Sequence, residues 1–404
     1  MAPTATLGDR SLFPDLSPKA YLNHAAISPP SAPVQAAVTQ CLSQYTQQGM
    51  AAFMTYLEQR EVLRASLATL VNVQPNEIGF VPNTSWGVVF AAMSYPWEAG
   101  DGVVLLDGEF PTNVTPWQQA ASLYGLDIHR IKAADFGSPD PGNGLAQLDV
   151  ALRAGAKVVA VSAVQFQTGM RMPLMAISAL AHRHGASVFV DAIQGCGVVP
   201  LDFEKLGVDM ASCGGHKWMM GLEGSGFVYV RESLGPKLRP RLSAWLSHQD
   251  GLGFLFDGPG HLRYDRPIKT DASMVEGGAY NTLGFVAMHT ALDLIQSIGV
   301  ESIFAHVQRY HDALEPKLTA LGLTSLRSPS PGERSGVLAF DVPEAFEPTA
   351  LPERLASRGI SASLPDGRLR FAPHWPNALD EVDVVAAAVA DAIDEAKSSE
   401  RPPA

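Results

Sequence analysis

Short apolar runs alternate with longer amphipathic stretches through the middle of the chain. The runs are typical of buried parallel strands, which are short and almost continuously apolar, and the stretches between them are typical of helices. The expected strands cover residues 78–81, 103–106, 127–131, 157–162, 187–191 and 226–230. Because parallel strands need crossover connections, this alternation predicts a mostly parallel sheet with helices on both faces. The predicted fold class is therefore α/β.

The pattern changes on either side of this region. Residues 240–270 are rich in Gly, Pro and Asp, which predicts an irregular excursion. Helical periodicity then leads into a smaller α+β unit, and two helices near the start are expected to pack back on that unit. The elements expected here cover residues 34–47, 56–71, 282–298, 300–321, 336–340, 351–358, 368–371 and 380–396.

A chain of 404 residues is long enough for two domains. The pattern divides it into an N-terminal tail, an N-terminal segment that packs on the small domain, a large cofactor-binding domain, a small C-terminal domain and a C-terminal tail. We expect these parts to cover residues 1–20, 21–75, 76–285, 286–397 and 398–404, in that order.

Composition and charge exclude several classes of protein. Hydrophobic residues make up 46% and charged residues 17%, which is typical of a compact chain. The net charge of −12 argues against binding of nucleic acid or an anionic membrane. Neither a signal peptide nor an apolar run of about 18 residues is found, so we expect a cytoplasmic protein without a membrane span. Three scattered cysteines form no CxxC pattern, and no metal site is expected.

The first candidate for chemistry is a strand that ends in a carboxylate, Asp191. A buried parallel strand delivers the residues at its end to the carboxyl edge of the sheet, where ligands bind in open α/β folds. An isolated aspartate at this place also serves as a helix cap, so both interpretations stay open for this residue alone.

The second candidate is a lysine among apolar residues, Lys217, which follows Gly214, Gly215 and His216 and precedes Trp-Met-Met. Glycines let the backbone approach a ligand closely, and burial weakens the preference of a lysine for its charged form. A desolvated amine is what an imine-forming enzyme needs. Taken alone, a lysine that extends to solvent from a helix start fits equally well.

The third candidate is an anion seat at Thr84 and Ser85, which follow a strand and open a helical pattern. Hydroxyl groups and free amides at a helix N-terminus bind phosphate, although a Thr-Ser pair is also an ordinary cap. An anion seat, a carboxylate and a lysine at strand-to-helix junctions of one sheet together predict a site for pyridoxal 5'-phosphate (PLP).

On these residues the chain resembles the class V aminotransferase family of fold-type I PLP enzymes. Members of that family include cysteine desulfurases, isopenicillin N epimerase-like proteins and kynureninases. The core of the resemblance is Val-Asp191-Ala-Ile-Gln194 followed by Gly-Gly-His216-Lys217, and it extends from Tyr21-Leu-Asn-His to the segment Leu-Arg370-Phe-Ala-Pro-His-Trp-Pro-Asn377. It implies a large domain with a mostly parallel seven-stranded sheet, a smaller α+β C-terminal domain, a PLP cofactor and a homodimer.

The resemblance also implies roles for individual residues. Lys217 would form an imine with the cofactor and later move the proton at the substrate Cα, while Asp191 would pair with the ring nitrogen. Phe110 would stack on the ring, with an ordinary core phenylalanine as the alternative. The remaining cofactor contacts would come from Thr84, Ser85, Gln194, His216 and Asn281, and the substrate contacts from Arg370, Asn23 and His24.

Two of these matches need comment. Arg370 matches the arginine that grips the substrate carboxylate, and Arg368 competes with it because residues two apart on a strand share a face. The family often has a Gly-Thr pair that reaches the phosphate of the second subunit. Here the stretch reads Glu276-Gly-Gly-Ala-Tyr-Asn281-Thr, so Asn281 or a backbone amide would replace it. Gly214 likewise stands where relatives often have a hydroxyl residue.

Transamination of an α-amino acid or a related amine is expected as the family's default reaction, with β-elimination (cleavage of a carbon–sulfur or related bond) second and epimerisation third. A persulfide-forming cysteine desulfurase is not expected, because no cysteine lies between Ser357 and Arg370. Alternatives of other classes are a PLP-binding protein without turnover and a dinucleotide-dependent oxidoreductase. Lys217, Asp191 and Arg370 together argue against the first, and the absence of a GxGxxG loop after a strand argues against the second.

Overall fold

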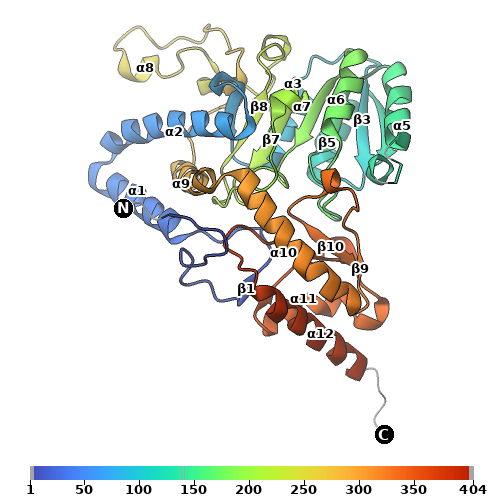
Figure 1. Ribbon diagram of the computed structural model, residues 1–404. Helices are drawn as coiled ribbons and strands as arrows, with labels where there is room; N and C mark the ends of the chain where they lie inside the picture. Colours follow the sequence, from blue (N-terminus) through green and yellow to red (C-terminus); the bar gives the residue numbers. More distant parts are fainter. Residues whose placement is uncertain (1–3, 138, 141, 400–404) are drawn as a thin grey trace.

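A seven-stranded sheet forms the centre of the computed structural model, which describes residues 4–137, 139–140 and 142–399 (Figure 1). The strand order is β2-β8-β7-β6-β5-β3-β4. The strands are β2 (Ile78–Val81), β3 (Gly102–Asp107), β4 (Asp127–Lys132), β5 (Ala156–Ser162), β6 (Ser187–Asp191), β7 (Met210–Gly214) and β8 (Gly226–Val230). Neighbours from β7 to β4 are parallel, whereas β8 is antiparallel to β7 and β2. The predicted α/β fold of fold-type I is confirmed.

Helices cover both faces of this sheet, because successive side chains of each strand point to opposite sides. In β5, Val159 and Val161 join one core cluster, and Val158 and Ala160 join another. The first cluster includes side chains of α5 (Gly142–Arg153) and α6 (Leu174–Arg183), and the second includes those of α3 (Thr84–Ser94) and α4 (Thr115–Tyr124). A short helix, α7 (Phe203–Leu206), precedes β7.

A smaller unit at the C-terminus, coloured orange to red in Figure 1, lies beside one end of the sheet. It contains an antiparallel sheet of order β12-β10-β9. Its elements are α10 (Val300–Ala320), β9 (Thr324–Ser325), β10 (Leu338–Asp341), α11 (Leu351–Ser357), β11 (Ile360–Ser361), β12 (Arg368–Phe371) and α12 (Glu381–Ser399). Residues 1–3 and 400–404 of the two expected tails lie outside the described residues.

The N-terminal segment contacts two parts of the molecule. β1 (Ala20–Tyr21) pairs in parallel with β11 of the smaller unit. The helices α1 (Ala32–Gln48) and α2 (Met50–Val71) pack on α9 (Thr282–Ile298). The 240–270 region contains a four-residue helix, α8 (Gly253–Phe256), within otherwise irregular chain. Among the described residues no single helix has the length and apolar character needed to cross a membrane, and only the bent pair α9 and α10 meets those criteria together.

Candidate active site

Lys217 lies in the turn after β7, and its amine is buried. Its Nζ lies 5.7 Å from the centroid of the Phe110 ring. Burial lowers the pKa of Lys217 to about 8, the carboxylate of Asp191 opposes that shift, and the positive charge of Arg370 adds to it. The fold therefore brings four residues predicted from the sequence into one electrostatic environment.

Asp191 ends β6 and is almost completely buried. Its Oδ1 accepts the N–H of Ile193 at 3.0 Å, which leaves Oδ2 for another donor. Burial raises the pKa of Asp191 to about 6, and the Ile193 N–H and Lys217 act in the opposite direction. Near neutral pH the carboxylate is thus largely ionised and able to hold a proton on a ring nitrogen.

The predicted anion seat is built from the start of α3 and the end of β7. Asn83 caps α3 by accepting the N–H of Trp86, and Thr84 Oγ1 accepts the N–H of Gly214 at 2.8 Å. A Cβ on Gly214 would lie 3.3 Å from that oxygen and 3.2 Å from the His216 ring. Thr84, Gly214 and His216 therefore lie close together beside the free amides of a helix N-terminus, an arrangement that suits a phosphate group.

Phe110 lies at the surface of the site, with 45% of its area exposed, and so is not a core residue. Its ring makes an edge-on contact with the ring of Phe166, at a centroid distance of 5.3 Å. Ser85 lies nearby, because its Oγ is 2.8 Å from Oγ1 of Thr112 in the loop that follows Phe110. The loop after β3 and the start of α3 thus approach the same edge of the sheet.

Arg370 on β12 carries a buried guanidinium that has no carboxylate partner among the residues the structure describes. Its Nε donates to Ser363 Oγ at 3.2 Å, and its Nη1 donates to the carbonyl of Phe166 at 2.9 Å. Burial lowers the pKa of Arg370 to about 10. By contrast, Arg368 lies 3.4 Å from Asp341 and is about one third exposed. An unpaired buried cation is costly, which marks Arg370 as the better anion site.

Three of the predicted contact residues, Gln194, Asn281 and His24, make side-chain hydrogen bonds within the protein. Gln194 donates to the carbonyl of Ala25 at 3.0 Å and accepts from Trp218 Nε1 at 2.8 Å. Asn281 caps α9, accepting the N–H of Gly284 at 3.1 Å, and donates to the carbonyl of Gly224 at 3.2 Å. His24 Nδ1 lies 2.7 Å from Ser28 Oγ, whereas the buried Oδ1 of Asn23 has no hydrogen-bond partner among the described residues. Their contacts with cofactor or substrate stay predictions.

A buried carboxyl group that sequence reasoning missed is Glu109, which directly precedes Phe110. It accepts hydrogen bonds from Ser162 N at 2.8 Å, from Ser162 Oγ and from Gln165 Nε2 at 3.1 Å. Burial raises its pKa to about 7, and the charge of Asp191 adds to this shift. The signal in the sequence was only that a charged residue directly precedes Phe110, the residue predicted to stack on the cofactor.

The loop after β5 was also missed, although it joins three parts of the site. Gln165 binds Glu109, the carbonyl of Phe166 accepts from Arg370, and Gln167 Oε1 accepts from Arg368 at 2.7 Å. These residues form no recognisable motif, and one of the contacts uses a main-chain atom that every residue has.

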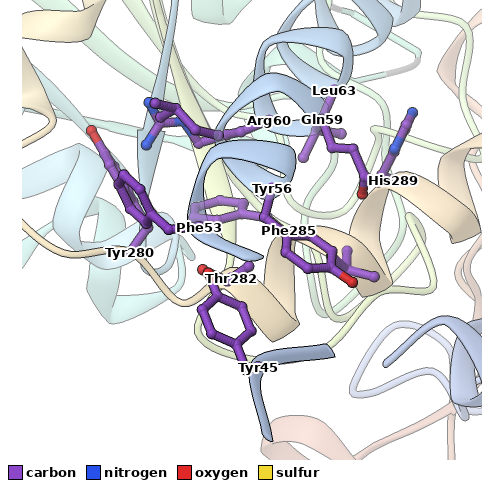
Figure 2. A pocket seen from close by; sticks show the side chains of 12 residues that line it. Tyr45, Phe53, Tyr56, Gln59, Arg60, Leu63, Tyr280, Thr282, Phe285 and His289 are labelled. Atoms are coloured by element: carbon purple, nitrogen blue, oxygen red, sulfur yellow. The ribbon is translucent and has the colours of Figure 1, made fainter. Parts of the chain in front are cut away.

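A cavity lies apart from these residues, between α2 and the start of α9 (Figure 2). Tyr45 and Tyr56 stack in it at 5.5 Å, and Arg60 lies 3.8 Å above the centroid of the Tyr280 ring. None of the predicted site residues lines it, and its volume of about 30 Å³ holds no more than water. It is therefore not a site for an amino acid.

The residues at the sheet edge fit PLP, because they supply an amine of lowered pKa, a buried carboxylate and a phosphate seat. A family model described as "Aminotransferase class-V" matches residues 20–367. The chain belongs to the class V aminotransferase family. Enzymes of this family use PLP, so the protein is a PLP-dependent enzyme of transferase or lyase type, as the sequence predicted.

Similar proteins include an uncharacterized aminotransferase and several cysteine desulfurases. The chain is 28% identical to an uncharacterized aminotransferase of Bacillus subtilis, over 92% of this chain and 94% of that protein. It is 27% identical to a probable cysteine desulfurase of Methanothermobacter thermautotrophicus (82% and 80% covered) and 28% identical to a cysteine desulfurase of Escherichia coli (82% of both).

Solved structures of similar fold include two relevant neighbours. A mutant of the enzyme C-DES with glycine covalently linked to its PLP cofactor has a TM-score of 0.85 at 25% identity, covering 95% of this chain and 99% of that chain. The apo cysteine desulfurase of Thermococcus onnurineus has a TM-score of 0.81 at 22% identity, covering 93% and 95%.

These comparisons correct the expected reaction. Transamination was ranked first and cysteine desulfurases were set aside, but most of the named relatives above are cysteine desulfurases. The ranking was wrong because Lys217, Asp191 and Arg370 serve every branch of the family equally and do not select among them. Cleavage of a carbon–sulfur bond, the second-ranked reaction, agrees better with the relatives.

Proposed function

We propose that the protein is a PLP-dependent lyase that cleaves the Cβ–S bond of a sulfur-containing amino acid by β-elimination. The electrostatic coupling of Lys217 with Asp191 and with Arg370, which has no carboxylate partner among the described residues, carries the PLP-dependent part of the proposal. The desulfurase names of several relatives, and a neighbouring structure titled as a cystine C–S lyase with its product cysteine persulfide, support the choice of a sulfur substrate.

Arg370 binds the substrate carboxylate. Its Nε and one Nη1 hydrogen are held by Ser363 and Phe166, which fixes the plane of the guanidinium and leaves Nη2 free. A fixed planar fork determines the orientation of the substrate, and therefore which bond at Cα is broken.

Lys217 moves the proton at Cα. With a pKa of about 8, a large share of its amines is neutral at pH 8, as a base must be. Asp191 holds a proton on the ring nitrogen of the cofactor, and Thr84 with the α3 amides holds its phosphate. When bound, PLP supplies an electron sink that stabilises negative charge at Cα.

The reaction balances without an external oxidant. Lys217 takes the Cα proton, the electron pair of the broken Cα–H bond forms the Cα–Cβ double bond, and the Cβ–S pair leaves on sulfur. With one water, cysteine then gives pyruvate, ammonia and hydrogen sulfide.

The test is product analysis with the PLP-loaded protein and L-cysteine, L-cystine and a panel of other amino acids. We expect pyruvate and ammonia in equal amounts, with sulfide or persulfide. Lys217→Ala should abolish them, whereas Lys205→Ala, which changes an exposed lysine on α7, should not. Alanine as the product would overturn elimination, and a 2-oxo acid that retains sulfur would overturn carbon–sulfur cleavage altogether.

A homodimer is the assembly that we propose, as the family implies. Exposed apolar side chains flank a groove of about 760 Å³ between α2 and the 240–270 region: Met50, Trp245 and Leu255 line it, and Met54 and Phe254 lie nearby. A second copy would cover this surface. Light scattering should give twice the chain mass of 43.1 kDa, and Trp245→Glu should reduce it. A monomer at micromolar concentration would refute the dimer.

The cytoplasm is the location that we propose. Three free, buried cysteines are compatible with a reducing compartment. Fractionation of cells that produce the protein should recover it with cytoplasmic markers, and recovery with membranes or in the medium would contradict the proposal.

A further inference from the structure

Three successive main-chain carbonyls around Lys217 accept hydrogen bonds from distant segments. The carbonyl of His216 accepts the N–H of Ser28 at 2.8 Å, and that of Lys217 accepts Ser28 Oγ at 2.6 Å. The carbonyl of Trp218 accepts Nε2 of His374 at 2.9 Å. Within the turn itself, Lys217 O also accepts the N–H of Met220 at 2.9 Å.

Ser28 is itself held in one orientation. Its hydroxyl proton is committed to the Lys217 carbonyl, so the Nδ1 of His24, 2.7 Å away, donates to its oxygen. His24 and Ser28 are both almost completely buried. The N-terminal segment also passes through Ala25, whose carbonyl accepts from Gln194. Two of the three distant hydrogen bonds to the Lys217 turn therefore come from Ser28, which lies 189 positions before Lys217 in the chain.

A flexible lysine loses conformational freedom when its amine becomes part of a covalent bond to a bound group. Fixing the backbone of that lysine beforehand reduces this loss, which is the usual effect of pre-organisation. The bond from Ser28 acts on the main chain of Lys217 itself, so its contribution should appear in cofactor retention as well as in stability.

We propose that Ser28, oriented by His24, is a positioning residue that fixes the Lys217 backbone for attachment of the cofactor. The proposal rests on attachment of PLP at Lys217, and it does not depend on which bond of the substrate is cleaved. The N-terminal segment thus supports Lys217 and also contains the predicted substrate contacts Asn23 and His24.

The chain offers a closely matched control for Ser28→Ala. Ser335 is as deeply buried as Ser28, and its Oγ also donates to a main-chain carbonyl at 2.6 Å, that of Gly169. Its oxygen also accepts one hydrogen bond, from Val337 N at 3.2 Å. Ser28→Ala and Ser335→Ala therefore remove the same kind of bond, but only the first acts on Lys217.

The experiment measures melting temperature and PLP retention of both variants and the wild-type protein. Retention is followed by the visible absorbance of bound cofactor during dialysis, and by mass spectrometry of PLP fixed on Lys217 with borohydride. We expect both variants to lose similar stability, while Ser28→Ala alone weakens retention, by about two- to tenfold, as expected for one hydrogen bond. Ser28→Cys, which keeps the volume but donates weakly, should lie between wild type and Ser28→Ala, and it decides the matter if Ser28→Ala does not fold.

Equal retention in the two alanine variants would overturn the positioning role, because Ser28 would then be an ordinary structural serine. Unchanged retention in Ser28→Ala would overturn it as well. If the wild-type protein carried PLP on Lys217 but released no pyruvate, the proposed lyase activity would fail while this proposal stood.

Discussion

Substitution of Arg370 tests the proposed carboxylate grip most directly. Nε and one hydrogen of Nη1 are held by Ser363 and Phe166, which leaves Nη2 and the second Nη1 hydrogen for a carboxylate. A hydrogen bond to a charged group contributes about 1.5–3 kcal/mol. Arg370→Lys keeps the charge but loses the fork, so kcat/KM should fall about 10- to 100-fold, because about 1.4 kcal/mol is a factor of ten. Arg370→Gln loses the charge and both bonds, and should cost about 100- to 10,000-fold.

The assay compares L-cysteine with cysteamine, which has the same amine and thiol but no carboxylate. Wild-type enzyme should strongly prefer L-cysteine, and Arg370→Gln should abolish most of that preference without a comparable change toward cysteamine. Arg368→Gln is the matched control on the same strand face. Because Arg368 is partly exposed and already paired with Asp341, its loss should change kcat/KM by less than about fivefold.

Two results would refute this reasoning. One is an Arg370→Gln enzyme that still discriminates against cysteamine, and the other is an Arg368→Gln enzyme that loses the discrimination. A third measurement separates binding from folding. Since Arg370 is buried without a carboxylate partner among the described residues, Arg370→Gln should leave the PLP-free protein at least as stable as wild type in a thermal melt.

Three further predictions follow from the shifted pKa values. Asp191→Asn removes a negative charge that raises the pKa of Lys217, so this pKa should fall below the wild-type value of about 8. Acylation of Lys217 in the PLP-free protein, measured against pH by peptide mass spectrometry, reports the pKa as its midpoint. An unchanged midpoint would contradict the prediction. Burial raises the pKa of Glu109 from 4.5 to about 7, so ionisation of this carboxyl group destabilises the fold as pH rises through that interval. The melting temperature of Glu109→Gln relative to that of wild type should therefore increase between pH 5 and about pH 8. A difference in melting temperature that does not change with pH would refute this prediction. Burial lowers the pKa of His374 from 6.5 to about 3, so protonation of this histidine in the unfolded chain lowers the free energy of unfolding as pH falls below 6.5. The free energy of unfolding of His374→Gln in urea should therefore depend less on pH than that of wild type between about pH 6.5 and pH 4. An equally steep dependence in the variant would exclude His374 as the cause.

Much of the fold could be predicted because its strands are short, apolar and bounded by turn residues. β2, β6, β8 and β12 have the bounds that the sequence predicted. The start of α2 was placed too late, at Tyr56 instead of Met50, because its first turns show no clear amphipathic period. Gly49, with a φ of 53°, is the only residue between α1 and α2 and makes the break between them.

The candidate site could be predicted only as far as its residue types are distinctive. A carboxylate at the end of β6 and a lysine among apolar residues after β7 both break an apolar pattern, and both lie at the predicted edge. Glu109 and the loop after β5 could not be found in this way. Their contributions depend on which carbonyl or carboxyl group meets which donor, and that is decided by the packing of segments far apart in sequence.

The charges of the site are suited to binding anionic groups, a property that every branch of the family needs. Burial moves Lys217, Arg370, Asp191 and Glu109 toward their neutral forms, and only some of these charges are compensated within the protein. Anionic groups of a cofactor and an amino acid would offset the free-energy cost of burying the positive charges of Lys217 and Arg370, whichever bond is later broken. The charge pattern therefore fits an α-amino acid, whereas the choice between elimination and the other branches depends on the leaving group at Cβ. Product analysis with sulfur and non-sulfur amino acids is consequently the measurement that separates them, and no substitution at Lys217 or Arg370 can replace it.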